Sequence, residues 1–207
     1  ATKIKKIGNL KFSETEIPKK NQLNKNIINF FKNKKIWCAS STHDGEEILC
    51  ANVHTKLKKK YKNLVTIIIP RHVHRTKTLV KSIKDLDLRV RCHSDKENIT
   101  EDTEVYVVDT YGETKLFFNI SETVFLGGSL VKHGGQNPLE PARLGCNIIH
   151  GPHINNFKEI YHLLNSKKMS YKILSINQMT NVINQLFKHK KNSKKIIDKI
   201  KKLGNDV

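Results

Sequence analysis

Residues 124–152, VFLGGSLVKHGGQNPLEPARLGCNIIHGP, bring together the residue types that bind a phosphate or a sugar acid. Two glycine pairs and a serine follow the apolar run 124–126 and leave room for a ligand. These residues are Gly127, Gly128, Ser129, Gly134 and Gly135. A glycine loop that leads into a helix gathers free backbone N–H groups at the positive end of the helix dipole, where anions bind. We therefore predict a ligand site here, with an ordinary tight turn as the alternative.

The residues after this loop predict the start of a helix. Asn137 is suited to cap it, Pro138 to its first turn, and Glu140 stands three residues after the cap. Gly145 marks the predicted end. Two roles stay open for Glu140, because its carboxylate can close a capping box or accept the hydroxyl groups of a ribose.

The elements that must position this loop alternate between strand and helix patterns. The predicted strands are 35–39, 65–69, 88–92, 104–108, 123–126, 147–150 and 171–174. The predicted helices are 46–61, 76–86, 113–120 and one that begins at Pro138. Such alternation is typical of an α/β fold in which helices cover both faces of a parallel sheet. We predict a Rossmann-like sandwich.

Polar or glycine-rich segments follow five of these strands. They contain Ser41, Thr42 and Gly45 after the first strand, Arg71 and His72 after the second, Tyr111 and Gly112 after the fourth, Gly127–Ser129 after the fifth and His150–Pro152 after the sixth. The carboxyl ends of parallel strands share one edge of the sheet, and ligands bind there at the topological switch point. The five segments therefore form one candidate site.

Several of these side chains have more than one possible role. Arg71 could hold a phosphate through two hydrogen bonds, or be a surface arginine without a ligand. Ser41 and Thr42 could contact a phosphate or sugar acid, or cap the next helix. His72 and His74 lie too close together in an extended segment to share a metal easily, and no third ligand is evident, so we expect no metal site.

The composition is that of a soluble globular domain with a strongly basic surface. The 207 residues are 37% hydrophobic and 28% charged, with a formal net charge of +19. Such a charge attracts nucleic acid, anionic lipid or acidic substrates, but lysine-rich solvated faces are an equally good explanation. No apolar run approaches the roughly 20 residues of a membrane span. The four cysteines lack CxxC spacing, which favours buried reduced thiols over a disulfide or zinc framework.

The sequence resembles the carboxyl half of the 3-deoxy-D-manno-octulosonic acid (Kdo) transferases. The segments that carry the resemblance are GNLKF (8–12), ASSTHDGEE (39–47), PRH (70–72), DTYGE (109–113), FLGGS (125–129), GGQNPLEP (134–141) and GPHINNFKEI (151–160). They span nearly the whole chain in the family's order. The resemblance implies one half of a GT-B glycosyltransferase, in which residues 35–190 form the nucleotide-sugar domain and residues 1–34 lead from an amino-terminal domain.

The resemblance also implies a role for each matched segment in binding CMP-Kdo, with no cofactor. Arg71 and His72 would serve the donor phosphate or the Kdo carboxylate, and Arg71 would stabilise the leaving group. Gly127, Gly128 and Ser129 would line the phosphate, and Asn137 and Glu140 would orient sugar and ribose hydroxyls. Tyr111 and Gly112 would border the cytosine, although a methionine is usual at the place of Tyr111.

The family places its general base, a glutamate, and its lipid-acceptor surface in the amino-terminal domain, and we expect this chain to be without that domain. We therefore expect a fragment that binds CMP or CMP-Kdo but transfers nothing alone. The whole enzyme would transfer Kdo to the lipid A precursor (lipid IVA) at the cytoplasmic face of the bacterial inner membrane, with inversion and without a metal. The alternatives are another nucleotide-sugar GT-B enzyme or a basic nucleic-acid-binding domain, which the 7% aromatic content disfavours.

The carboxyl-terminal residues 191–207 predict a basic helix. Its apolar positions would form one stripe with lysines around it: Ile196, Ile197, Ile200 and Leu203. This stripe could pack on the protein or lie on an anionic membrane, and we favour packing, because a terminal helix in this architecture usually returns to the domain.

Overall fold

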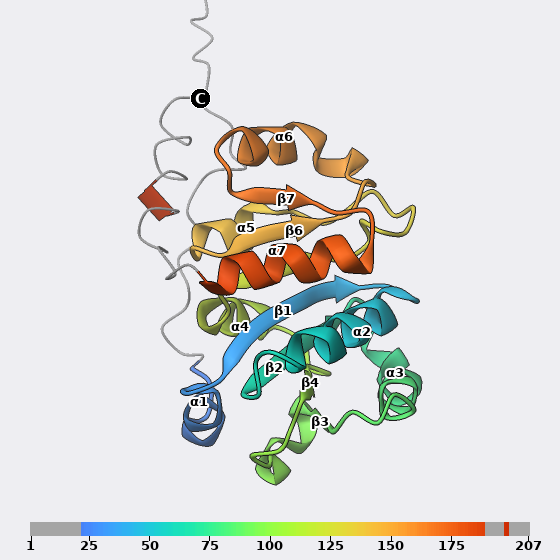
Figure 1. Ribbon diagram of the computed structural model, residues 1–207, viewed down its shortest axis with the longest axis vertical. Coiled ribbons are helices and arrows are strands. Elements are labelled where there is room, and N and C mark those ends of the chain that lie inside the picture. Colours follow the sequence, from blue (N-terminus) through green and yellow to red (C-terminus); the bar gives the residue numbers. More distant parts are fainter. Residues whose placement is uncertain (1–21, 189–196, 199–207) are drawn as a thin grey trace, which may run out of the picture.

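The computed structural model describes residues 22–188 and 197–198, and its centre is a parallel sheet of seven strands (Figure 1). The strand order is β3-β4-β2-β1-β5-β6-β7. The strands are β1 (Lys35–Thr42), β2 (Leu64–Pro70), β3 (Val90–Cys92), β4 (Val105–Val107), β5 (Thr123–Leu126), β6 (Asn147–His150) and β7 (Ser170–Lys172). Every neighbouring pair is parallel. The predicted Rossmann-like sheet is confirmed.

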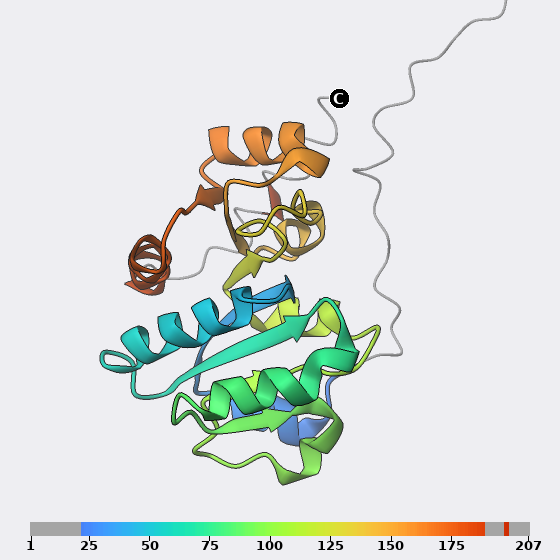
Figure 2. The same ribbon diagram turned by 90° about the vertical axis from the view of Figure 1, so that its right-hand side faces the viewer.

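Helices cover both faces of this sheet (Figures 1 and 2). One face carries α1 (Lys25–Phe31), α4 (Thr114–Ile120), α5 (Leu139–Arg143) and α6 (Lys158–Ser166). The other face carries α2 (Glu46–Lys58), α3 (Thr76–Lys84) and α7 (Ile176–Lys188). Short 3₁₀ turns complete the structure: η2 (Val73–Arg75), η3 (His93–Asn98) and η4 (Asn155–Phe157). The sheet therefore separates two hydrophobic cores.

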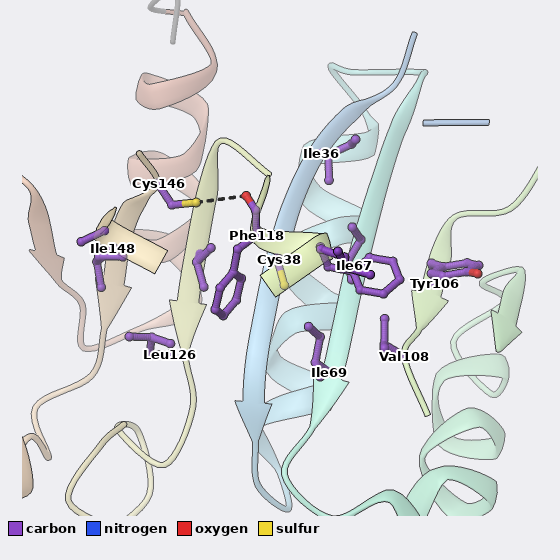
Figure 3. Packing of buried hydrophobic residues seen from close by; sticks show 14 of the residues in the cluster. Ile36, Cys38, Ile67, Ile69, Tyr106, Val108, Phe118, Leu126, Cys146 and Ile148 are labelled. Carbon is purple, nitrogen blue, oxygen red and sulfur yellow. Dashed lines mark hydrogen bonds between the residues drawn. The ribbon is translucent and has the colours of Figure 1, made fainter. Parts of the chain in front are cut away.

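The strand sequences supply both cores because side chains alternate between the faces of a sheet. In β1, Ile36 and Cys38 join the core beneath α1 and α4, while Trp37 and Ala39 join the core beneath α2. Figure 3 shows the first core, in which the Cys146 thiol donates to the Phe118 carbonyl at 3.2 Å. The consecutive apolar residues 36–39 of β1 therefore indicate burial on both faces.

The predicted elements differ from the observed ones at their ends, and helices α1, α6 and α7 were not predicted. The strand that we predicted to end at residue 39 continues to Thr42, since β2 pairs with Ser40 and Thr42 on either side of an irregularity at Ser41. The third and fourth strands are shorter than predicted, with three residues each. The helix that we predicted from Pro138 begins at Leu139 and has five residues.

Helix α1 was not predicted. It lies within residues 1–34, which we expected to be an interdomain segment, and it buries Ile27, Phe30 and Phe31 in the first core. The Asn24 side chain caps it by accepting a hydrogen bond from the Asn26 backbone N–H at 2.9 Å. Residues 22–34 therefore contribute to this domain's core. Of the predicted basic helix 191–207, the structure describes only Ile197 and Asp198, which are helical, so the other three residues of the apolar stripe, Ile196, Ile200 and Leu203, lie outside the described residues.

The four cysteines are free thiols, as predicted. Cys38, Cys50 and Cys146 are buried, and burial raises the pKa of Cys38 and Cys50 well above the usual range. Burial also raises the pKa of the half-buried Cys92 to about 11. These thiols therefore stay protonated at neutral pH and pack as small apolar groups.

Candidate functional site

The topological switch point lies between β1 and β5, at the centre of the sheet. The chain runs from β1 to β2 on one side and later returns to β5 on the other. The carboxyl end of β1 leads into His43 and the start of α2, and that of β5 leads into Gly127. In this architecture the crevice at such a point binds ligands. Two of the predicted site segments therefore meet where a ligand site is expected.

A buried carboxylate, that of Glu46, lies at this point and joins the two segments. Glu46 is fully buried in the first turn of α2. Its Oε2 accepts from the backbone N–H of His43 at 2.9 Å and of Gly128 at 2.8 Å. Its Oε1 accepts from the N–H groups of Ser129 at 3.2 Å and of Leu130 at 3.0 Å. One side chain therefore satisfies four backbone donors from segments more than 80 residues apart.

This arrangement corrects the expectation that the glycine loop presents free N–H groups. The N–H of Gly127 donates to the Ser40 carbonyl at 2.8 Å. The next three N–H groups donate to Glu46. A ligand anion could reach these donors only by displacing an internal carboxylate. The loop has the geometry of an anion site, but in this structure the protein's own carboxylate fills it.

Ser129 connects this loop to the next strand. Its Oγ donates to the Leu126 carbonyl and accepts from the Gly151 N–H at 2.8 Å. Its own carbonyl accepts from the His153 N–H at 2.9 Å. The residue is completely buried. Ser129 thus holds the loops after β5 and β6 together, and its assignment to the donor phosphate stays a prediction.

Two of the loop glycines are required for different reasons. A Cβ on Gly127 would lie 2.6 Å from the Thr42 Cα and 2.8 Å from the Glu46 carboxylate, so no side chain fits there. Gly134 has φ of +83°, which favours glycine, and a Cβ there would also collide with the Asn156 side chain. Gly127 is therefore required because other atoms lie too close for a side chain, and Gly134 is required in part by its left-handed backbone.

Histidine side chains gather beside the loop. The ring of His43 stacks on that of His133, with centroids 4.1 Å apart, and meets His72 edge to face at 5.9 Å. His72 and His133 are exposed, whereas His43 is buried. Burial lowers the pKa of His43, and the nearby His133, His72 and Arg71 act in the same direction, while Glu46 opposes them. The structure therefore brings the predicted residues Arg71, His72 and Gly128 close to an unpredicted one, His43.

Arg71 is positioned by the end of β2. Its backbone N–H donates to the Thr42 carbonyl at 2.9 Å, and its side chain is exposed at the sheet edge. Arg75, four residues later, forms ion pairs with Asp44 at 2.6 Å and with the buried Glu47 at 3.0 Å. Burial raises the pKa of the Glu47 carboxyl, and Arg75 opposes that shift. Arg75 therefore fixes the segment after β2 against α2 and leaves Arg71 at the surface.

Ser41 and Thr42 do not cap α2, which was one of their two possible roles. The N-cap residue is Gly45, with φ of +85° and no side-chain hydrogen bond to the helix. Ser41 has φ of +54°, at an irregularity in the pairing of β1 with β2 between Ser40 and Thr42. Ser41 is partly exposed and Thr42 is buried. A ligand role for either hydroxyl stays a prediction.

The segment after β4 is exposed at its tip and fixed at both ends. Asp109 accepts from the Ser94 N–H at 2.8 Å and from its hydroxyl at 2.6 Å. Glu113 pairs with the buried His93 at 3.0 Å. Between them Tyr111 is 78% exposed, and Gly112 has φ of +84° with open space around it. A groove of about 600 Å³, lined in part by His74, Cys92 and Asp109, opens beside this segment.

The segment before α5 does not form a capping box, which was one of the two possible roles of Glu140. The Asn137 side chain accepts from the Leu139 N–H at 3.1 Å, so it does stabilise the start of the helix. Glu140, however, forms an ion pair with Lys115 of α4 at 3.4 Å and is partly exposed. Gly145 ends the helix with φ of +79°, as predicted. The second glycine pair, Gly134 and Gly135, is buried, and the Gly135 N–H donates to the Gly128 carbonyl at 2.8 Å.

Residues 22–188 and 197–198 contain no group of three or more histidine, cysteine, aspartate or glutamate side chains placed to hold a metal ion. None of the helices found there is long and apolar enough to cross a lipid bilayer.

Known proteins with similar sequences are named Kdo transferases, although no family model matches the chain. The 3-deoxy-D-manno-octulosonic acid transferase of Haemophilus influenzae is 34% identical over 176 residues, which are 85% of this chain and 40% of that protein. The transferase of Rickettsia bellii is 31% identical over 182 residues, or 87% of this chain and 43% of that protein. The chain thus spans about two fifths of these relatives.

Among solved structures, the C-terminal CMP-Kdo binding domain of WaaA from Acinetobacter baumannii matches with a TM-score of 0.77 and 25% identity. The match covers 84% of this chain and 90% of that domain. Trehalose-phosphate synthases share only the fold, as the Burkholderia multivorans enzyme does with a TM-score of 0.55 and 6% identity. The chain therefore belongs to the Kdo transferase family and corresponds to the carboxyl-terminal, Rossmann-like half of a GT-B glycosyltransferase.

Proposed function

We propose that this domain binds the nucleotide sugar CMP-Kdo as the donor half of a Kdo transferase. The observation that carries the proposal is the match to the CMP-Kdo binding domain of WaaA over 84% of the chain. The position of Arg71 supports it, since a guanidinium at the carboxyl edge of a central strand can hold a phosphate through two hydrogen bonds.

The geometry supports a division of roles around the switch point. Arg71 and His72 are exposed beside His43 and would hold the donor phosphate or the Kdo carboxylate. Tyr111 and Gly112 would border the cytosine, because their segment is exposed between two fixed ends. Asn137 and Glu140 would orient hydroxyl groups. In this proposal Gly127, Gly128 and Ser129 shape the crevice, and their N–H groups remain bonded to Glu46 and Ser40.

In the whole enzyme the transfer would be a direct displacement without a metal. A general base in the amino-terminal domain removes a proton from an acceptor hydroxyl of the lipid A precursor (lipid IVA). The hydroxyl oxygen then bonds to the anomeric carbon of Kdo, whose bond to the phosphate oxygen breaks, and CMP leaves with inversion. Arg71 would stabilise the charge on the departing phosphate. The domain alone would bind the donor and transfer nothing.

The acceptor is a lipid, so we place the enzyme at the cytoplasmic face of the bacterial inner membrane. The formal net charge of +19 supports that location, because basic surfaces are attracted to anionic headgroups. The same charge would also attract nucleic acid, and a comparison of ligands separates the two possibilities.

Titration of the domain with CMP, UDP and a short oligonucleotide tests the proposal. We expect weak, saturable CMP binding that survives 0.5 M salt, no comparable response to UDP, and oligonucleotide binding that disappears in the same salt. NMR shift changes or calorimetry provide the measurement. No response at millimolar CMP, or equal responses to CMP and UDP, would overturn the assignment.

The substitution Arg71→Ala tests the proposed contact between Arg71 and the phosphate. It should weaken CMP binding by about 1.5–3 kcal/mol, the usual contribution of a hydrogen bond to a charged group, and leave cytidine binding almost unchanged. Lys62→Ala, which removes one positive charge from an exposed position, is the matched control. Equal losses for CMP and cytidine would remove Arg71 from the phosphate role.

A further inference from the structure

His43 is a buried imidazole with an unused hydrogen-bonding atom at the switch point. Only 9% of the residue is exposed, and its Nε2 has no hydrogen-bond partner. Most buried polar side-chain atoms are paired, because an unpaired one loses its bonds to water without replacement. An unpaired nitrogen in a candidate crevice therefore indicates a partner from outside the chain.

The surroundings of this nitrogen leave little else to bind it. Gly128 has no side chain there, and an added Cβ would lie 3.2 Å from Nε2. The exposed ring of His133 covers His43 on one side. The charged and titratable groups that face His43 are Glu46 from α2, Arg71 and His72 from the segment after β2, and His133 from the loop after β5.

These neighbours favour an anion as the missing partner. The loop N–H groups that would usually bind one are held by Glu46, so a ligand anion here has to be bound by side chains. Arg71 carries a permanent positive charge. Burial lowers the pKa of His43 in the unliganded domain, so its ring is neutral at pH 7, and a bound anion would favour the protonated form.

We propose that Nε2 of His43 donates a hydrogen bond to the anionic group of the nucleotide sugar, with Arg71 and His72 beside it and His133 as a cover that moves aside. The proposal rests on the function proposed above and adds to it a residue that binds donor and takes up a proton. The anionic group is either the phosphate or the carboxylate of the sugar, and the two share this chemistry.

The sign of the pH dependence follows from the two states of His43. If the bound anion raises the pKa of the ring, binding takes up a proton in the interval between the unliganded and liganded pKa values. Affinity then rises as the pH falls through the liganded pKa and becomes constant below the unliganded one. A rise of about one pKa unit corresponds to a tenfold preference of the ligand for the protonated form.

NMR titration of the histidine ring signals, with and without ligand, measures this directly. The first probe is the methyl ester of CMP, whose single charge does not change between pH 5 and 8, and cytidine is its uncharged control. Free Kdo tests the carboxylate. We expect the pKa of His43 to rise by about one unit with the anion that it binds and to stay unchanged with cytidine.

The two proposals fail in different ways. If the CMP ester binds but neither it nor Kdo changes the pKa of His43, this inference is wrong and the proposed function stands. If neither cytidine nor its phosphates bind, the proposed function fails, and this inference fails with it.

Variants provide a second readout. His43→Gln keeps a hydrogen-bond donor but no charge, so it should abolish the proton uptake measured by calorimetry in buffers of different ionisation enthalpy. His133→Ala should retain the uptake and bind the ester at least as tightly as the unmodified domain. His74→Gln, at an exposed position that contacts His72 and not His43, is the matched control. If proton uptake persists in His43→Gln, a group other than His43 takes up the proton. If His43→Gln does not fold, the ring titration of the unmodified domain decides.

Discussion

The loops after β5 and β4 lie at the same edge of the sheet but are built in opposite ways. Residues 127–129 of the loop after β5 are buried, and the N–H groups of residues 127–130, together with Ser129 Oγ, bond within the protein. The loop after β4 is fixed only at Asp109 and Glu113, and between them Tyr111 is exposed. In our proposal the first is a scaffold that sets the shape of the crevice, and the second presents side chains to the ligand.

The two loops need glycine for different reasons. Gly127 is required because Thr42 and Glu46 lie against its Cα, and Gly112 is required only by its positive φ. Changes in the loop after β5 should therefore reduce stability, and changes in the loop after β4 should reduce affinity. The following substitutions test this expectation, in order of decreasing effect.

Glu46→Ala should have the largest effect. It leaves four N–H groups without their acceptor, three of them in the β5 loop. Each unsatisfied buried donor costs about 1–3 kcal/mol, so even with partial relaxation the free energy of unfolding should fall by at least ~3 kcal/mol. Urea unfolding followed by circular dichroism gives the value.

Glu159→Ala is the control for that measurement. Glu159 also lies in the first turn of a helix, α6, but is exposed, so its removal should change stability by less than about 0.5 kcal/mol. A similar small effect of Glu46→Ala would show that the loop after β5 does not depend on the carboxylate.

Gly127→Ala should reduce stability more than Gly112→Ala. At Gly127 the added methyl group overlaps backbone and carboxylate atoms, and such overpacking costs about 1–3 kcal/mol. At Gly112 nothing lies within 4 Å, so only the left-handed backbone opposes the change, at about 1 kcal/mol. Thermal unfolding of the two variants gives the order, and the reverse order would contradict the assigned roles.

Tyr111→Ala should leave stability unchanged and weaken ligand binding. The side chain is 78% exposed, so its removal leaves no cavity. Stacking of a base on an aromatic ring contributes about 1–3 kcal/mol in single-stranded nucleic acid complexes, and we expect the lower end of that range here. CMP and cytidine should lose affinity equally, in contrast to Arg71→Ala. A loss confined to CMP would place Tyr111 near the phosphate instead.

Glu140→Gln should have only a small effect on stability. The ion pair with Lys115 is 3.4 Å long and partly exposed, and pairs of this kind contribute about 0–1 kcal/mol. If Glu140 holds ribose hydroxyls, CMP affinity should fall while the melting temperature stays constant. Lys115→Gln separates the two roles, because it breaks the same ion pair and keeps the carboxylate. If both variants reduce CMP affinity equally, the ion pair and not the carboxylate is responsible.

The strands and the edge that carries the site could be predicted from sequence because both follow from local patterns. Apolar runs such as 65–69 identify buried strands, and parallel strands must share their carboxyl edge. Helix α1 could not be predicted in the same way. Its seven residues bury Ile27, Phe30 and Phe31 within a lysine- and asparagine-rich stretch whose composition favours an exposed segment.

The role of Glu46 could not be predicted because its partners lie far away in sequence. A glutamate in the first turn of a helix is common, since it interacts favourably with the helix dipole. Only the fold shows that three of its four donors come from residues 128–130. The unpaired nitrogen of His43 is likewise visible only once the rings of His72 and His133 are placed around it.

The buried thiols can be used to measure local opening of the domain. Alkylating reagents attack the thiolate, and burial keeps Cys38 and Cys50 both inaccessible and protonated. The two side chains lie on opposite faces of the sheet, Cys38 in the core beneath α1 and Cys50 in the core beneath α2. Their labelling rates, read by mass spectrometry without denaturant, would therefore show whether the two helical layers separate from the sheet together or one at a time.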